Sequence, residues 1–176
     1  MFESLKQKYA RFIIRRKFLR KEAAAVSYNK ILSDAIDFFF IMPEHDDDFY
    51  HSLDILKYYL IHKKVITLFL PAHKYNLIPE KDKYKFVSFL PDHVNRVYLP
   101  RKNMIASLSA REYDVVIDLN RTENIFFSAV ANIVKSKVRA SFGKGKSDEY
   151  YNLVIGGKNQ ESETAYRSFL SYLKMF

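Results

Sequence analysis

The 176-residue sequence contains no cysteine, and this absence excludes three kinds of chemistry. The chain can form neither a disulfide framework nor a zinc site built on thiolates, and it has no cysteine nucleophile. Long apolar runs are absent too: the longest, residues 35–43, is interrupted by Asp37 and falls well short of the roughly 20 residues that a helix needs to cross a bilayer. The apolar stretch at residues 12–14 is too short for a secretory signal peptide. We therefore expect a cytoplasmic protein without a transmembrane segment.

The chain does contain enough apolar and aromatic residues, 48% and 16% of the total, to bury a core in a single domain. Its formal net charge of +9 is concentrated at one end. Residues 1–22 hold two acidic side chains against eight basic ones: Lys6, Lys8, Arg11, Arg15, Arg16, Lys17, Arg20 and Lys21. The remaining residues are only mildly basic, so these eight cations are the candidates for binding an anionic partner.

The basic segment has the periodicity of an amphipathic helix over about residues 2–25. Apolar residues recur at intervals of three and four: Phe2, Leu5, Tyr9, Phe12 and Ile13. Lys8, Arg11 and Arg15 fall on another face. Such a helix can bind RNA phosphates, lie on an anionic membrane, or pack its apolar stripe on the domain or a partner while its cations stay in water. We interpret residues 1–30 as a basic amphipathic helical extension and residues 31–176 as the domain.

From residue 37 onward, short apolar runs alternate with helical stretches. Buried strands are predicted at residues 37–43, 65–70, 113–119, 138–142 and 151–155, with weaker candidates at 84–90 and 95–99. Helices are predicted alongside them at residues 47–63, 101–111, 122–135 and 161–175. This alternation predicts an α/β fold with a Rossmann-like, doubly wound and mostly parallel sheet. Ligands of such sheets bind beyond the carboxyl ends of the strands, here the loops at residues 43–48 and 119–124.

The first of these loops is strongly acidic. Four carboxylates and an imidazole follow one another there: Glu44, His45, Asp46, Asp47 and Asp48. They can supply a general base or oxygen ligands for a cation, or they can cap the following helix and favour its positive end. His51 lies three residues after Asp48 and so on the same face of that helix. The histidines show no paired metal-ligand spacing, and we expect neither a metal nor a cofactor.

The second loop holds polar residues suited to a sugar or an anion. Asn120 begins it, Arg121 can hold a phosphate or a carboxylate, and Thr122 or Asn124 can hydrogen-bond a sugar. Equally, Thr122 can be the N-cap of the next helix and Arg121 an ordinary surface charge. Further along, residues 143–147 lack the full spacing of a phosphate-binding loop, and they predict a flexible basic turn.

The sequence combines two blocks in a distinctive order. Residues 38–53, FFFIMPEHDDDFYHSL, pass from a strand through a loop into a helix. Residues 113–120 form a second strand; residues 137–143 follow as a basic strand ending in glycine, and residues 151–155 open on Tyr-Asn. Together they resemble the N-terminal, acceptor-side domain of the bacterial heptosyltransferases, the ADP-heptose-dependent glycosyltransferases of lipopolysaccharide core assembly. Short bacterial proteins with this one domain behind a basic helix are similar as well.

The resemblance implies one half of a GT-B fold. It places Asp48 where that family has its catalytic carboxylate, which would take the proton of the acceptor hydroxyl. Asp47 stands where the family has a loop glycine, and this hinders close approach of a phosphate to the backbone. The family's second domain, which binds the nucleotide sugar, would begin where this sequence ends.

Two functions follow as expectations. The first is a binding or scaffold module that is non-catalytic on its own and uses its basic helix to engage a membrane surface, RNA or a protein complex. A peripheral position at the inner face of the membrane fits that expectation. The alternative is the acceptor-binding half of a glycosyltransferase of cell-envelope glycan assembly, with Asp48 as general base.

Overall fold

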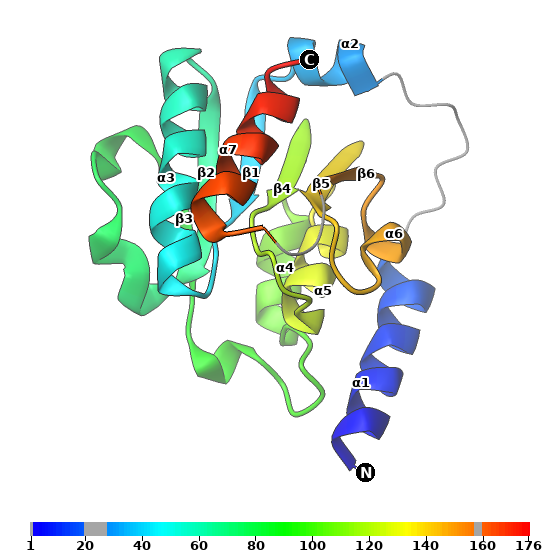
Figure 1. Cartoon of the computed structure of the whole chain (residues 1–176). Coiled ribbons are helices and arrows are strands. Elements are labelled where there is room, and N and C mark those ends of the chain that lie inside the picture. The colour runs from blue at the N-terminus through cyan, green and yellow to red at the C-terminus, as the bar shows by residue number, and fades with distance from the viewer. Residues whose placement is uncertain (1, 20–27, 157–159) are drawn as a thin grey trace.

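The sheet follows from strands that are apolar along their whole length. The computed structural model describes residues 2–19, 28–156 and 160–176. Within them, six strands form one sheet of parallel pairs in the order β3-β2-β1-β4-β5-β6 (Figure 1). Their bounds are β1 Asp37–Ile41, β2 Val65–Pro71, β3 Lys85–Phe89, β4 Val115–Asp118, β5 Val138–Phe142 and β6 Leu153–Ile155. This is the strand order of a Rossmann-like doubly wound sheet, and the predicted fold class is confirmed.

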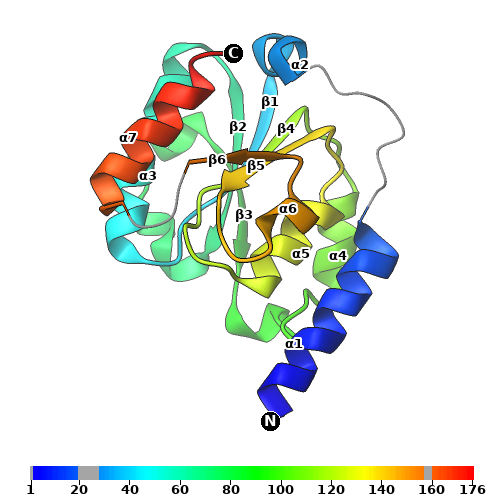
Figure 2. The ribbon, with the colours of Figure 1, turned by 45° about the vertical axis from the view of Figure 1, so that its right-hand side comes forward.

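Helices cover both faces of the sheet because its central strands are apolar on both. In β1, Phe38 and Phe40 point to one face and Phe39 and Ile41 to the other, and all four are buried. The first face carries α2 (Tyr28–Asp34), α3 (Asp46–Ile61) and α7 (Ser162–Leu173). The second carries α1 (Phe2–Ile13), α4 (Lys102–Ser109), α5 (Ile125–Ile133) and α6 (Ser147–Tyr150) (Figure 1, Figure 2). The core is therefore split into two layers by the sheet.

The segment between β2 and α4 departs most from the prediction. It contains three short 3-10 helices: η2 (Ala72–Leu77), η3 (Lys81–Lys83) and η4 (Pro91–His93). β3 forms at the candidate strand 84–90, but the described residues 95–99 form no strand. Instead, the Asn95 side chain accepts hydrogen bonds from the backbone N–H groups of Val97 (2.9 Å) and Leu99 (3.0 Å). The strand prediction was wrong there because the asparagine side chain closes a turn around itself.

The basic helix packs on a different face from the one its apolar periodicity indicates. α1 continues as a π-helix, η1 (Ile14–Phe18), while residues 20–25 of the predicted helix lie outside the described residues. Ala10 and Ile14 are fully buried and pack with α5. No helix in the three described ranges is long and apolar enough to span a membrane.

Candidate functional site

The strand order reverses between β1 and β4, and the two loops that follow these strands meet there. Asn120 joins the loops. Its side-chain nitrogen donates to the carbonyl oxygen of Met42 (3.2 Å), and its side-chain oxygen accepts from the backbone N–H of Glu44 (3.0 Å). The Asn124 side chain donates to the Glu44 carboxylate (3.2 Å). Three predicted site residues, Glu44, Asn120 and Asn124, are thus brought together, and they bond to one another across the switch point.

Asn120 also belongs to a buried polar cluster, the Asp118 cluster, which consists of Asp118, Asn120, Lys144 and Tyr151. The Lys144 ammonium donates to Asp118 Oδ2 (2.7 Å) and to the carbonyl oxygen of Asn120 (2.5 Å). The Tyr151 hydroxyl donates to the same Oδ2 (2.5 Å), and the Asn120 side chain donates to Oδ1 (2.8 Å). Asp118 is 1% exposed and Lys144 5%. One carboxylate therefore ties the end of β4 to the turn after β5 and to the segment before β6.

Burial dominates the electrostatics of the Asp118 cluster. It lowers the pKa of the Lys144 ammonium, an effect that Asp118 opposes, and it raises the pKa of the Tyr151 hydroxyl well above its usual value. The prediction of a flexible basic turn at residues 143–147 is wrong for Lys144, which is anchored inside the protein. This cluster was not predicted, because its local signals in the sequence are only an aspartate at the end of an apolar strand and a lysine between two glycines.

Asp48, the candidate general base, lies in the first turn of α3 and is buried. Its Oδ1 accepts hydrogen bonds from the Arg121 guanidinium (3.1 Å) and from the Ser162 hydroxyl (2.7 Å). Arg121 also donates to the backbone carbonyl of Gln160, at the approach to α7. The structure therefore brings together Asp48 and Arg121, one from each of the two predicted ligand-binding loops. Oδ1 of the candidate base therefore already accepts two hydrogen bonds within the protein.

The rest of the acidic loop is exposed. Asp46 forms an ion pair with Lys74 (2.9 Å), and this hydrogen-bonded partner lowers the pKa of the Asp46 carboxyl. Lys74 itself is buried and donates to the carbonyl oxygen of Glu44 (2.5 Å). His45 and Asp47 are exposed, and His51 is half-buried. Among the described residues, no three His, Asp or Glu side chains are grouped so that they could hold a metal ion.

The caps of the two helices differ from the expected ones. α3 begins at Asp46, and its N-cap is His45, whose side chain makes no capping hydrogen bond. The three aspartates therefore occupy the first turn, where they favour the positive end of the helix. In the second loop the N-cap of α5 is Asn124, which accepts from the backbone N–H of Phe126 (2.9 Å). Thr122, the predicted cap, lies outside the helix and is exposed.

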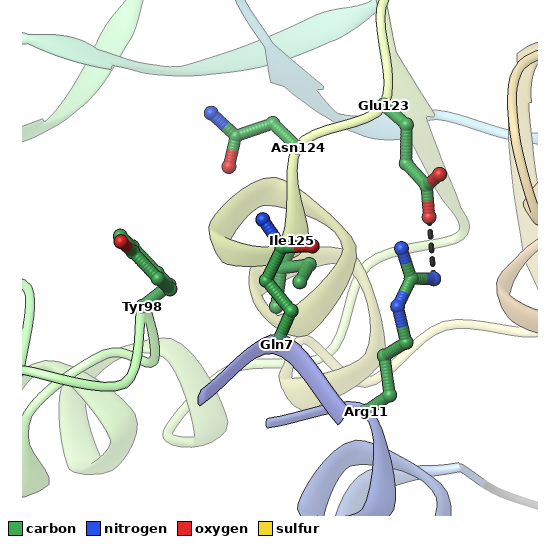
Figure 3. A pocket seen from close by; sticks show the side chains of 6 residues that line it. All are labelled: Gln7, Arg11, Tyr98, Glu123, Asn124 and Ile125. Carbon is green, nitrogen blue, oxygen red and sulfur yellow. Dashed lines mark hydrogen bonds and ion pairs between the residues drawn. The ribbon is translucent and has the colours of Figure 1, made fainter. Parts of the chain in front are cut away.

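A cavity of about 300 Å³ lies beside the start of α5 (Figure 3). Its lining comprises Gln7, Arg11, Tyr98, Glu123, Asn124 and Ile125. The Arg11 guanidinium donates to the Glu123 carboxylate (2.6 Å), which raises the pKa of Arg11. Tyr98 lies on the opposite side of the cavity from this pair in Figure 3. The described charged residues of the lining are thus already paired with each other.

A larger groove, the α1 groove, has a volume of about 790 Å³. It lies between α1 with η1 and the segment that leads into α4, which run close to each other in Figure 2. Six apolar side chains contribute to its lining: Ile13, Phe18, Val97, Leu99, Pro100 and Ile105. Three cations line it as well: Lys17, Arg101 and Lys102. None of the described lining residues is acidic.

The known protein families contain a match to almost the whole chain. A family model described as a family of unknown function, DUF6913, matches residues 6–176. The chain belongs to this family. No curated protein matches it. The matched region includes α1 from Lys6 onward, so the DUF6913 unit comprises the basic helix together with the sheet.

In this DUF6913 domain, α1 turns large apolar side chains away from the core. They lie on the outer face of α1, which we define by Leu5, Lys8, Tyr9 and Phe12 together with Arg16 of η1. Leu5, Tyr9 and Phe12 are 57%, 55% and 52% exposed. The Arg16 guanidinium lies 6.0 Å from the centre of the Phe12 ring. The outer face is therefore both apolar and cationic.

The basic residues of the N-terminal segment divide into two groups. Three form ion pairs with carboxylates of the same chain: Lys6 with Glu3 (2.8 Å), Arg11 with Glu123 (2.6 Å) and Arg15 with Glu149 (2.6 Å). Lys8, Arg16 and Lys17 are exposed and form no ion pair with a described residue. Arg20 and Lys21 lie outside the described residues. Of the predicted anion-binding cations that the structure describes, those without an ion pair lie on the outer face and in the α1 groove.

Proposed function

We propose that this protein is a non-catalytic Rossmann-like module that attaches to an anionic membrane surface through the outer face of α1. One observation carries the proposal: Leu5, Tyr9 and Phe12 of α1 are each more than half exposed, whereas Ala10 of α1 and Ile14 of η1 are buried. An amphipathic helix at a membrane interface places its apolar residues in the acyl boundary and its cations among the headgroups. The position expected for the protein is peripheral, at the inner face of the membrane.

The energetics support weak and reversible attachment. Full burial of a Leu or Phe side chain is worth about 1.5–3 kcal/mol, so three side chains that are half exposed contribute about 3 kcal/mol. Each Lys or Arg near an anionic surface adds about 1 kcal/mol, and Lys8, Arg16 and Lys17 are free to do so. The resulting 6 kcal/mol or so is comparable with the marginal membrane affinity of a single acyl anchor.

A membrane explains the outer face better than RNA does. RNA phosphates would attract Lys8 and Arg16, but they offer nothing apolar to Leu5. Bases stack on aromatic rings, which leaves the aliphatic side chain in water. An acyl boundary takes up aliphatic and aromatic side chains alike.

The hydrogen bonds across the switch point support the non-catalytic part of the proposal. Doubly wound proteins bind their ligands between the two loops that Asn120 joins here. Arg121 and Ser162 occupy Asp48 Oδ1. The fold alone does not imply catalysis, so its resemblance to a glycosyltransferase half is compatible with a binding role.

Vesicle flotation tests the proposal. The full chain should float with vesicles that contain phosphatidylglycerol and should remain behind with pure phosphatidylcholine vesicles, because the cations need anionic headgroups. Leu5→Ser with Phe12→Ser should weaken flotation by about tenfold or more, since these two side chains supply roughly 2 kcal/mol of the apolar contribution. Ile61→Ser is the matched control: Ile61 is 69% exposed at the end of α3, and its replacement should leave flotation unchanged. RNA binding that survives the serine variants, without any flotation, would overturn the proposal in favour of RNA.

The glycosyltransferase alternative is kept because Asp48 and Arg121 lie together at the switch point. In this reading the chain is the heptosyltransferase-like acceptor half of a bacterial enzyme, and an arriving acceptor displaces Arg121 from Asp48. Asp48 then takes the proton of the acceptor hydroxyl. The alternative predicts sugar transfer from a nucleotide sugar when a donor-binding domain is supplied, and loss of that transfer in Asp48→Asn. A chain that gives no transfer with any such partner excludes it.

A further inference from the structure

We propose that the α1 groove binds one anionic lipid from the membrane, with the acyl chain along its apolar lining and the phosphate at Lys17, Arg101 and Lys102. This inference rests on the proposed function, because it names the molecule that the membrane-facing side of α1 would take up. The groove has the size of a small-molecule site, since about 790 Å³ falls inside the usual range of roughly 300–1,000 Å³.

The chemistry of the lining matches an amphiphile. Ile13 and Phe18 on one side, and Val97, Leu99 and Ile105 on the other, offer apolar surface to a hydrocarbon chain. A ligand that was only ionic would leave this surface in water. The groove therefore selects a molecule with an apolar part.

The charges specify the other end of that molecule. Lys17, Arg101 and Lys102 are exposed, and none of them forms an ion pair with a described residue. The three cations line one groove with no acidic residue in its described lining, so an anion bound there would meet attraction from all three. A phosphate headgroup supplies that anion, and Arg101 can bind two of its oxygens at once.

The position of the groove identifies the membrane as the source. Tyr9 lines the α1 groove and also belongs to the outer face, where it is more than half exposed. The groove is therefore continuous with the surface that the proposed function places on the lipid. The phosphate of a bound lipid would contact the three cations, and its acyl chain would lie between α1 and residues 97–105. Such a lipid would not have to leave the membrane interface completely.

The test uses dodecyl phosphate at concentrations below its micelle point, so that binding does not require a vesicle. Isothermal titration calorimetry of the full chain should show saturable binding to one site. Arg101→Gln with Lys102→Gln should weaken it about thirtyfold, because two cations are removed from the phosphate. Both side chains are exposed, so the fold should survive, which circular dichroism checks. Lys30→Gln with Lys137→Gln, which removes two cations from a different concave surface at the other end of the sheet, is the matched control and should bind normally.

The outcomes separate this inference from the proposed function. The inference is supported if the Leu5→Ser, Phe12→Ser double variant binds dodecyl phosphate with the same affinity as the unchanged chain. This holds even if the variant no longer floats with vesicles. Equal affinity for dodecyl phosphate and inorganic phosphate overturns the inference, because the apolar lining would then contribute nothing. Flotation without any dodecyl phosphate binding also overturns it and leaves the proposed function standing.

Discussion

Replacing Lys144 with methionine should destabilise this protein more than the same replacement at any exposed lysine. Lys144 neutralises the Asp118 carboxylate at 2.7 Å, and both groups are almost completely withdrawn from water. Methionine keeps much of the apolar stem but leaves the carboxylate with only the Tyr151 and Asn120 donors. Removal of one partner from a buried pair costs about 3–5 kcal/mol. A domain has about 5–15 kcal/mol of stability in all, so about a fifth or more of it should be lost.

Urea unfolding followed by far-ultraviolet circular dichroism measures this loss. Lys144→Met should lower the urea midpoint without changing the slope of the transition, since the surface exposed on unfolding hardly changes. Lys146→Met is the control: this neighbour is exposed, its nearest carboxylate oxygen on Glu149 is 3.9 Å away, and its loss should cost less than about 0.5 kcal/mol. Equal midpoints for the two variants would refute the reasoning, because the buried pair would then contribute no more than a surface charge.

A double replacement and a change of pH sharpen the same prediction. Asp118→Asn with Lys144→Met should cost less than the sum of the single changes, because neither charge is left alone. Burial lowers the pKa of Lys144 in the folded state, so just below about pH 10.5 the unfolded chain binds more protons than the folded chain does. The penalty of Asp118→Asn should therefore shrink as the pH rises toward 10.5, since Lys144 can then be neutral when it is buried. A penalty that does not change with pH would mean that Lys144 stays charged without its partner.

Three further predictions concern other parts of the molecule. Phe12→Trp introduces the only tryptophan of the chain, and its fluorescence should shift to the blue with phosphatidylglycerol vesicles; an unchanged spectrum despite flotation would show that the outer face is not the contact. Burial raises the pKa of Tyr84 to about 12, so the stability that the neutral hydroxyl contributes is fully present below pH 10 and is lost as the pH rises toward 12. Tyr84→Phe should therefore flatten the fall of the urea midpoint between pH 10 and 12, and parallel curves for the two proteins would contradict the raised pKa. Asn124→Ala should cost about 1 kcal/mol through loss of the α5 cap, whereas Thr122→Ala should be nearly neutral; the reverse order in urea unfolding would restore Thr122 as the cap.

The sequence predicted the order of the strands and helices because their apolar patterns are local. The run at residues 65–70 is apolar at nearly every position, which is typical of a strand covered on both sides. The same reasoning failed at residues 95–99, where one asparagine side chain outweighs the apolar alternation by closing a turn. α2 has no expected counterpart, since its seven residues are too few to show a period.

The candidate site was predicted in outline. Parallel strands place their carboxyl ends at one edge, so the loops that hold Asp48 and Arg121 had to approach each other. That these two side chains pair, and that Ser162 joins them from 114 residues away, depends on how α7 packs beside α3. Lys144 looked like an exposed lysine in a glycine-rich turn, because no local pattern reveals a partner 26 residues earlier in the chain.

For α1, the sequence by itself determined the helix, the spacing of its apolar residues and its excess of positive charge, because these depend only on neighbours along the chain. Only the tertiary structure decided which side of the helix faces the core. Ala10 and Ile14 pack there, and Arg11 and Arg15 reach the carboxylates of Glu123 and Glu149. Those contacts between distant residues turn Leu5, Tyr9 and Phe12 outward, and so they create the surface on which the proposed function depends.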